Sequence, residues 1–273
     1  MKILISNDDG IHSKGIRVLA ERLAEEDIHE VYVVAPDRER SATGHSLTLH
    51  KPLRTATVEF SSHVKAAWST TGTPSDCVKL AVMELLPERP DIVISGINNG
   101  PNLGSEVLYS GTVAAAMEGA FLDIPSVAVS MEYGEKRHWE VAAEFINSLV
   151  SLFPKAHLAP RTLLNVNVPN LPSEDIQGVL ITELGVRLYN DWFEKRTDPR
   201  GRVYYWLAGH AIDEGEAEHS DAWAVYNKNI SITPISFNMT DRATKDRLLK
   251  LPELTKMFSH DPKKKPIKSR EHK

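Results

Sequence analysis

Short apolar runs alternate with longer amphipathic stretches through the first two-thirds of the chain. Five short runs have the continuous apolar character of buried strands: residues 3–6, 31–35, 92–95, 126–130 and 163–168. Four stretches between them carry apolar side chains at three- and four-residue spacing, which predicts helices: residues 15–26, 75–86, 112–122 and 139–153. This alternation predicts an α/β fold with a doubly wound, mostly parallel sheet that helices cover on both faces.

The pattern changes near residue 185, where aromatic and turn-rich sequence replaces the alternation. Residues 203–206 are Val-Tyr-Tyr-Trp, and Pro234 interrupts an extended run over residues 229–235, so both segments are expected to be antiparallel or peripheral. Aromatic side chains that cannot reach the central sheet need cover from a neighbouring segment or subunit. We therefore divide the chain into three parts: a core over residues 1–184, an extended region over 185–241 that completes the same domain, and a C-terminal helix with a basic tail over 242–273.

Composition excludes several classes of protein. Of the 273 residues, 41% are hydrophobic and 25% are charged, which is typical of a globular protein. No apolar run approaches the roughly 18 residues that a membrane span needs, so we expect no membrane partner and a cytoplasmic location. The net charge of -5 argues against a nucleic acid polymer as partner. The single cysteine, Cys77, excludes an internal disulfide and lies in an apolar stretch typical of a buried thiol.

Polar loops follow three of the predicted strands, at residues 7–10, 36–46 and 96–102, and ligands bind at the carboxyl ends of strands in an open parallel sheet. Asp8 and Asp9 would be adjacent carboxylates at the end of a buried strand, where they repel each other and lose hydration. A bound cation would offset both costs, and Ser41 and Asn98 add oxygen donors that suit Mg²⁺ or Mn²⁺. By itself, an Asp-Asp-Gly sequence is also typical of a surface turn.

A second candidate feature is the start of the helix predicted near residue 112. Ser110, Gly111 and Thr112 precede a run of small residues, and a helix N-terminus offers free backbone N–H groups and hydroxyl donors to a phosphate. Simple N-capping is the alternative, and the two roles are compatible. Gly44 and His45 lie in the second polar loop, where the histidine is either a titratable group near the substrate or a structural one.

Taken together, five motifs resemble the SurE family of stationary-phase survival proteins with 5′-nucleotidase activity. They occur in the family's order at residues 5–10, 35–46, 71–76, 95–102 and 110–112. The resemblance is dense over residues 1–130 and thinner as far as residues 231–234. Five spaced motifs in one order are far more specific than any one of them alone.

The resemblance implies a Rossmann-like core with a C-terminal antiparallel or extended extension used in oligomerisation. It also implies homodimers or homotetramers that exchange C-terminal segments. One divalent metal ion, Mg²⁺ or Mn²⁺, is expected in each subunit. Its implied ligands are Asp8, Asp9, Ser41 and Asn98. The implied substrates are nucleoside 5′- and 3′-monophosphates and, in some members, short polyphosphate. The sequence departs from the family mainly after Val186, in the region assigned to assembly.

The expected reaction is hydrolysis by a water molecule that the metal activates, with Asp8 or Asp9 accepting the proton. The phosphate-binding set would be Asn7, Gly44, His45, Asn102, Ser110, Gly111 and Thr112. One alternative enzyme forms an aspartyl-phosphate on Asp8. A nicotinamide-dependent oxidoreductase is disfavoured because acidic residues, not a glycine-rich turn, follow the first strand. A protein that senses metal and nucleotide without catalysis is the alternative from another class.

Overall fold

The computed structural model of the chain describes residues 1–25, 28–61, 63–156, 158–212 and 217–256. The basic tail predicted at the C-terminus lies outside these residues. The chain forms two compact units, Met1–Ser236 and Phe237–Lys273. The second unit contains the helices α6 (Arg242–Leu249) and α7 (Pro252–Lys256). All the predicted site residues belong to the first unit.

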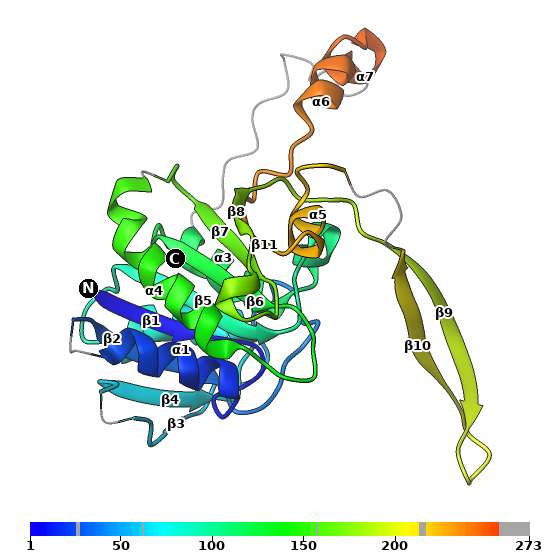
Figure 1. The fold of residues 1–273 in the computed structure, drawn as a ribbon. Coiled ribbons are helices and arrows are strands. Elements are labelled where there is room, and N and C mark those ends of the chain that lie inside the picture. Colours follow the sequence, from blue (N-terminus) through cyan, green and yellow to red (C-terminus); the bar gives the residue numbers. More distant parts are fainter. Residues whose placement is uncertain (26–27, 62, 157, 213–216, 257–273) are drawn as a thin grey trace, which may run out of the picture. The chain divides into compact units, whose positions relative to one another are not determined.

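A single large sheet organises the first unit (Figure 1). Among the described residues its strand order is β3-β4-β2-β1-β5-β6-β7-β11-β8. The strands are β1 (Lys2–Ser6), β2 (Glu30–Pro36), β3 (Thr55–Thr57), β4 (Ala66–Thr70), β5 (Ile92–Asn99), β6 (Ser126–Met131), β7 (Thr162–Val168), β8 (Gly178–Ile181) and β11 (Asn229–Ser236). The strands from β4 to β7 are parallel, β3 and β11 are antiparallel to β4 and β7, and β8 is parallel to β11. The predicted α/β fold class is therefore confirmed.

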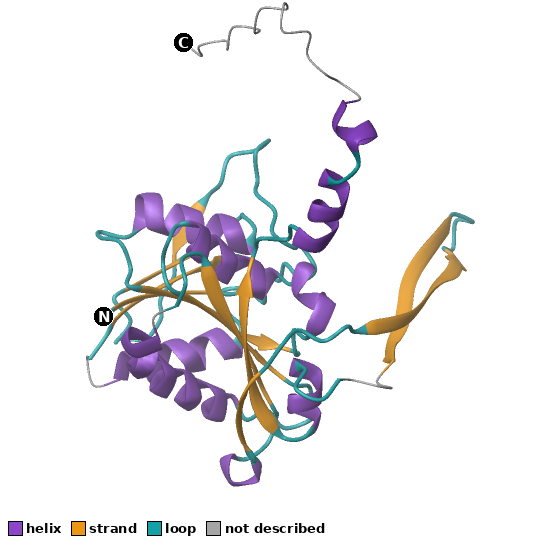
Figure 2. Cartoon of the chain, turned by 90° about the horizontal axis from the view of Figure 1, so that it is seen from above, coloured by secondary structure: helices purple, strands orange, loops and turns teal. Residues whose placement is uncertain are grey.

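Helices cover both faces of the sheet (Figure 2). On one face, α1 (Lys14–Ala24) and α4 (Trp139–Ala156) share an apolar core with Ile3 and Ile5 of β1. On the other face, α2 (Pro74–Leu80) and α3 (Gly111–Phe121) cover Leu4. Successive residues of a strand point to opposite faces, so the apolar run of β1 fills both cores. Cys77 lies in the second core, and burial raises the pKa of its thiol to about 12.

Local sequence explains where some elements begin and end. Thr73 caps α2 by accepting a hydrogen bond from the Asp76 backbone N–H, and the Asp76 carboxylate accepts one from the Thr73 N–H in return. Pro74 occupies the first helical turn, where its missing N–H costs nothing. The helix predicted over residues 75–86 ends earlier, and a π-helical turn (Ala81–Leu85) completes it.

Three strands of the large sheet, β3, β4 and β8, were not predicted. The predicted strand β11 lies inside this sheet and not at its periphery. The strands β3 and β8 are short edge strands, and β4 mixes polar with apolar residues, so none has a continuous apolar run. The run at residues 229–235 forms β11 as an extended strand antiparallel to β7, as expected. It is not peripheral, because β8 pairs with its other edge.

The chain reverses its direction of travel across the sheet between β1 and β5. It passes from β1 outward to β2 and β4, and then returns to β5 on the other side of β1. Loops that leave the carboxyl ends of the two central strands therefore diverge to opposite sides, and at such a position doubly wound folds form a ligand-binding crevice. Three of the four predicted metal ligands lie here: Asp8 and Asp9 follow β1, and Asn98 lies at the end of β5.

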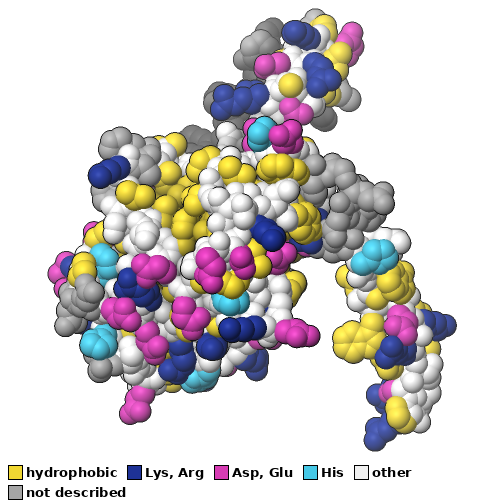
Figure 3. All heavy atoms as spheres, in the orientation of Figure 1, with side chains coloured by type: hydrophobic (Ala, Val, Ile, Leu, Met, Phe, Trp, Pro, Cys, Tyr) yellow, Lys and Arg dark blue, Asp and Glu magenta, His cyan; other side chains and the backbone are white. Residues whose placement is uncertain are grey.

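The strands β9 (Leu188–Thr197) and β10 (Val203–Ile212) form an antiparallel hairpin with its own two-stranded sheet. Hydrophobic side chains lie along this hairpin (Figure 3). Among the hairpin side chains whose exposure the structure describes, five are at least half exposed: Trp192, Phe193, Tyr205, Trp206 and Leu207. None of the helices in the described part of the chain combines the length and the apolar character that a bilayer crossing requires.

Candidate active site

Asn7 shapes the turn that carries the acidic pair. Its Nδ2 donates to the Gly10 carbonyl at 3.0 Å and to the Ser13 hydroxyl at 2.8 Å, while its Oδ1 accepts from the Gly10 N–H at 3.1 Å. Gly10 has a φ of 97°, a conformation that favours glycine. In this structure the Asn7 side chain bonds within the turn, and its predicted phosphate contact stays a prediction. The buried amide holds Asp8 and Asp9 in place.

Asp8 and Asp9 are carboxylates that burial disfavours in their charged forms. The Asp8 side chain is only 5% exposed, and burial raises its pKa to about 6; the charge of Asp9 adds to this rise, and a hydrogen bond from Thr112 opposes it. Burial also raises the pKa of Asp9, against a hydrogen bond from the Asn99 N–H at 3.2 Å. A nearby cation would lower both pKa values and offset the desolvation of both groups.

The second and third polar loops meet the first at the crevice. The Arg40 N–H donates to the Asp8 carbonyl at 2.7 Å, and Ser41 is the next residue of this loop. On the other side, the Asn99 N–H bonds to Asp9, and Asn98 precedes it where the pairing of β5 with β6 shifts register. The structure therefore brings together the loops that carry the four predicted metal ligands.

The two neutral ligands are engaged in local hydrogen bonds. The Ser41 hydroxyl donates to Glu39 at 2.6 Å, and the Asn98 amide nitrogen donates to the Gly100 carbonyl at 2.8 Å. These bonds use the donor groups, so the Ser41 lone pairs and the Asn98 amide oxygen remain as acceptors for a cation. The described residues contain no cluster of three or more His, Cys, Asp or Glu side chains with metal-binding geometry. A cation at this site would need these neutral oxygen donors.

The N-terminus of α3 lies directly against Asp8. Ser110 is the N-cap, and its hydroxyl accepts from the Val113 N–H at 3.0 Å. A Cβ on Gly111 would lie 2.7 Å from the Asp8 Cβ and 2.8 Å from its Oδ2, so only glycine permits this approach. The Thr112 hydroxyl donates to the Asp8 carboxylate. Thr112 thus orients a predicted metal ligand, a contact that the sequence did not indicate.

Gly44 and His45 fasten the second loop to the same helix region. The Gly44 N–H donates to the Tyr109 carbonyl at 3.0 Å. The His45 Nε2 lies 2.8 Å from the Glu118 carboxylate, and its ring stacks on Phe121 with the ring centroids 5.2 Å apart. The structure therefore places His45 on the side of α3, where it anchors the loop that carries Ser41.

Glu118 is a functional candidate that sequence reasoning missed. Its side chain is buried in α3 and binds both His45 and the Lys79 ammonium, each at 2.8 Å. Burial raises the pKa of this carboxyl, but the hydrogen bonds from His45 and Lys79 outweigh that effect and lower its pKa overall. A lone acidic residue within the small, apolar run of residues 113–120 was the available signal.

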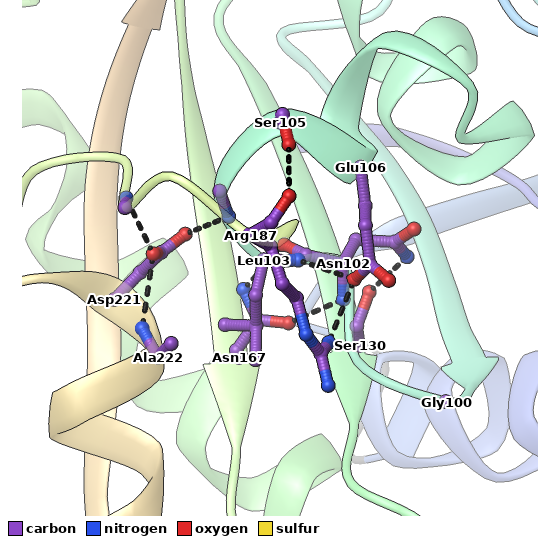
Figure 4. A network of polar contacts seen from close by, with 12 residues as sticks. Gly100, Asn102, Leu103, Ser105, Glu106, Ser130, Asn167, Arg187, Asp221 and Ala222 are labelled. Carbon is purple, nitrogen blue, oxygen red and sulfur yellow. Dashed lines mark hydrogen bonds and ion pairs between the residues drawn. The ribbon is translucent and has the colours of Figure 1, made fainter. Parts of the chain in front are cut away.

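Asn102 belongs to a buried polar network behind the crevice (Figure 4). Its Nδ2 donates to the Ser130 hydroxyl at 2.7 Å, and its N–H donates to the Asn167 Oδ1 at 2.8 Å. Its carbonyl accepts from Asn165 at 2.9 Å and from Asn167 at 3.0 Å. These bonds join the loop after β5 to β6 and β7. The side chain of Asn102 holds this loop, and its predicted phosphate contact stays a prediction.

The same region connects to the segment that leads into the hairpin. The buried carboxylate of Asp221, in α5 (Asp221–Tyr226), accepts from the Gly104 N–H at 2.8 Å and from the Gly185 N–H at 2.9 Å. The Arg187 guanidinium binds Glu106 at 2.8 Å (Figure 4). Residues 185–187 therefore bond to Asp221 and to the loop after β5. That loop follows the predicted ligand Asn98 in the sequence.

The buried Asp8 and the partly buried Asp9 lie at the switch point of a doubly wound sheet, beside the N-terminus of a helix. The fold and this site define the class as an α/β protein with an acidic site at the switch point. The chain belongs to the SurE family, which is described as Survival protein SurE and matches residues 3–191.

Named relatives and a solved structure cover most of the chain. A protein of Thermosynechococcus vestitus named 5′-nucleotidase SurE is 51% identical over 245 residues, covering 88% of this chain and 92% of that protein. One of the same name from Pelotomaculum thermopropionicum is 49% identical over 262 residues, covering 96% and 99%. The crystal structure of the SurE protein from Aquifex aeolicus is similar with a TM-score of 0.78 at 39% identity, covering 91% of this chain and 98% of that one.

Proposed function

We propose that this protein is a metal-dependent phosphomonoesterase that hydrolyses nucleoside 5′-monophosphates to nucleoside and phosphate. The observation that carries the proposal is the contact between the buried carboxylate of Asp8 and the N-terminus of α3 at Gly111. It supports a proposed cation site beside a proposed anion site, which is the arrangement that phosphoryl transfer requires. Relatives of about half identity that are named 5′-nucleotidase SurE support the same activity. We extend the proposal to 3′-monophosphates and short polyphosphate, which present the same terminal phosphate.

Asp8, Asp9, Ser41 and Asn98 would hold one divalent cation, Mg²⁺ or Mn²⁺, in each subunit. The donor set fits a hard cation, because all four ligands are oxygen atoms and the two carboxylates carry compensating charge. Burial raises the pKa values of Asp8 and Asp9, so both carboxylates are disfavoured in their charged forms, and a bound cation would offset this cost. When bound, such a cation polarises the phosphate ester and lowers the pKa of water.

The chain's own residues then have separate tasks. The N–H groups at the start of α3, at Gly111 and Thr112, are proposed to bind the non-bridging phosphate oxygens, and the Ser110 hydroxyl fixes the helix terminus. In this structure the Thr112 N–H bonds to the Asp8 carboxylate. Asp8 or Asp9 accepts the proton of the attacking water.

Four of the predicted phosphate-binding residues act mainly by holding the loops of the site in place. Asn7 and Asn102 hold the first and third loops, and Gly44 with His45 holds the second. Their contribution is to keep the metal ligands and the helix terminus in one geometry.

A phosphate-release assay tests the function. The purified chain is incubated with 5′- and 3′-nucleoside monophosphates, ribose 5-phosphate and polyphosphate, with Mg²⁺ or Mn²⁺. We expect release from the 5′-monophosphates that is lost on chelation and restored by metal, because the charge of the cation is essential to the transition state. Metal and nucleotide binding without any release would identify a sensor instead. A trapped phospho-enzyme would favour the aspartyl-phosphate route.

We also propose a homodimer or homotetramer that exchanges segments C-terminal to residue 184. The exposed apolar side chains of the β9–β10 hairpin support it, because an isolated hairpin with such a surface is only marginally stable in water. Phe193 and Leu207 are cross-strand partners that are 68% and 63% exposed. We expect light scattering to give a multiple of the 30.4 kDa subunit mass. The double variant Phe193→Ser, Leu207→Ser should dissociate.

Arg200→Ser, at the exposed tip of the same hairpin, is the matched control and should leave the mass unchanged. A monomeric parent chain would contradict the assembly proposal. It would not bear on the phosphatase assay, because the proposed metal ligands all come from one subunit.

A further inference from the structure

An exposed tyrosine stands next to the candidate site on the side of β6. Tyr133 lies in the loop after β6, the strand that neighbours β5, and its side chain is 68% exposed. Gly100, with a φ of 139°, lies under the phenol: a Cβ there would be only 2.5 Å from the Tyr133 Cζ. Gly100 follows Asn99, whose N–H binds the Asp9 carboxylate. The hydroxyl end of the ring therefore lies over Gly100, the residue next to Asn99, which bonds to the proposed metal ligand Asp9.

The loop that carries Tyr133 is braced by other residues. The Arg137 guanidinium lies 5.7 Å from the centroid of the Tyr133 ring and donates to the Glu132 carbonyl at 3.0 Å. The Asn170 side chain accepts from the His138 N–H at 3.0 Å and donates to the Lys136 carbonyl at 2.8 Å. The aromatic ring is held in position without being buried. An aromatic surface ordered in advance loses little conformational entropy when a ligand stacks on it.

The second loop borders the opposite side of the site. There the Arg40 N–H bonds to the Asp8 carbonyl, and the Gly44 N–H bonds to the Tyr109 carbonyl. A nucleotide whose phosphate is bound at the proposed metal ligands and the start of α3 would extend along the carboxyl ends of the strands toward β6, where Tyr133 is exposed.

We propose that Tyr133 is a specificity-determining residue that stacks on the nucleobase of the substrate. The inference rests on the proposed function and adds the reason why the substrate is a nucleotide and not any phosphate ester. Every nucleobase has a π-face, so the contact accepts all of them, with the larger face of a purine gaining most. The contact is equal in the ground state and the transition state, so it should affect KM and not kcat.

The test compares AMP with ribose 5-phosphate, which has the same phosphate and sugar but no base. In Tyr133→Ala we expect KM for AMP to rise by about five- to tenfold, in line with the loss of one base–aromatic stack. The KM for ribose 5-phosphate and both kcat values should stay at the parental level. Tyr133→Phe should restore the parental KM for AMP, because it keeps the ring. Melting temperatures should match, since the ring is exposed.

Three outcomes would overturn the proposal: an unchanged KM for AMP, equal changes for the two substrates, or the expected pattern in Tyr109→Ala instead. Tyr109 is 69% exposed on the other side of the crevice, so the last outcome would place the base there. If the parent released no phosphate from any substrate, the proposed function would fail separately. Calorimetric binding of AMP and of ribose 5-phosphate to the parent and to Tyr133→Ala, with Mn²⁺, would then decide the stacking question.

Discussion

Asp8→Asn should abolish most phosphate release while the protein stays folded. Asp8 and Asp9 supply all the formal negative charge among the four proposed ligands, so the substitution removes half of it. Mn²⁺ affinity should fall sharply, and turnover should fall by at least roughly 100-fold, the scale seen when one essential electrostatic contact is lost. The amide has nearly the shape of the carboxylate and can still accept the Thr112 hydrogen bond. The geometry of the turn should therefore survive.

The same variant should be more stable than the parent in the absence of metal. Burial raises the pKa of Asp8 from 3.8 to about 6, so the folded state holds this proton more tightly than the unfolded state does. Metal-free stability is therefore lost as pH rises from about 4 to 6 and stays lost above that range. Asparagine mimics the protonated form, so Asp8→Asn should gain on the order of 2–3 kcal/mol at pH 7 and nothing below pH 4.

Calorimetric Mn²⁺ binding, melting temperature in chelator across pH, and phosphate release on the same samples check this prediction. Asp9→Asn should lose metal and activity as well, with a smaller gain in stability because Asp9 is less buried. Asp91→Asn is the matched control. This aspartate precedes β5, at the amino ends of the parallel strands and away from the site, and its carboxylate accepts a hydrogen bond from the Lys2 N–H at 2.7 Å. Parental metal binding and turnover in both site variants would reduce the Asp-Asp-Gly sequence to a structural turn.

Gly111→Ala should inactivate the enzyme through a single methyl group. The added Cβ would lie 2.7 Å from the Asp8 Cβ, closer than real Cβ contacts, so either the carboxylate or the start of α3 must move. A displacement of that size should lower turnover by about 100-fold and weaken Mn²⁺ binding. Overpacking should also cost about 1–3 kcal/mol of stability. Alanine favours helix more than glycine does, so any loss cannot be attributed to helix propensity.

Gly178→Ala in β8 serves as the control, because a Cβ there would meet its nearest neighbour at an ordinary 3.5 Å. Circular dichroism and melting temperature show whether α3 is retained in Gly111→Ala, and calorimetry reports the metal site. Parental turnover and metal affinity in this variant would mean that Asp8 and the helix terminus do not act as one site.

The sequence alone was sufficient for the fold class and for the prediction that three polar loops meet. Continuous apolar runs such as residues 3–6 mark strands that are buried on both faces, and this signal does not depend on distant residues. The rule that ligands bind at the carboxyl ends of strands then placed the loops after β1, β2 and β5 together. The bonds from the Arg40 N–H to Asp8 and from the Asn99 N–H to Asp9 confirm that these loops meet.

Elements without a strong apolar pattern could not be predicted in the same way. The strand β3 has three exposed residues, and β8 is a short strand at the other edge of the sheet. Pairing with a neighbour places them in the sheet, and that pairing leaves little trace in the local sequence. For the same reason, the place of β11 between β7 and β8 depended on contacts between segments more than 50 residues apart.

The direction of each polar side chain was decided only by the tertiary structure. The amides of Asn7 and Asn102, which were predicted as phosphate contacts, hold loops in this structure, and Thr112 bonds to Asp8 across 104 positions of sequence. His45 meets Glu118 across 73 positions. A local pattern specifies which residues reach the carboxyl edge of the sheet, because that depends on strand periodicity and loop position. Which of them meet one another depends on how separate helices and loops pack, and that packing is a property of the whole folded chain.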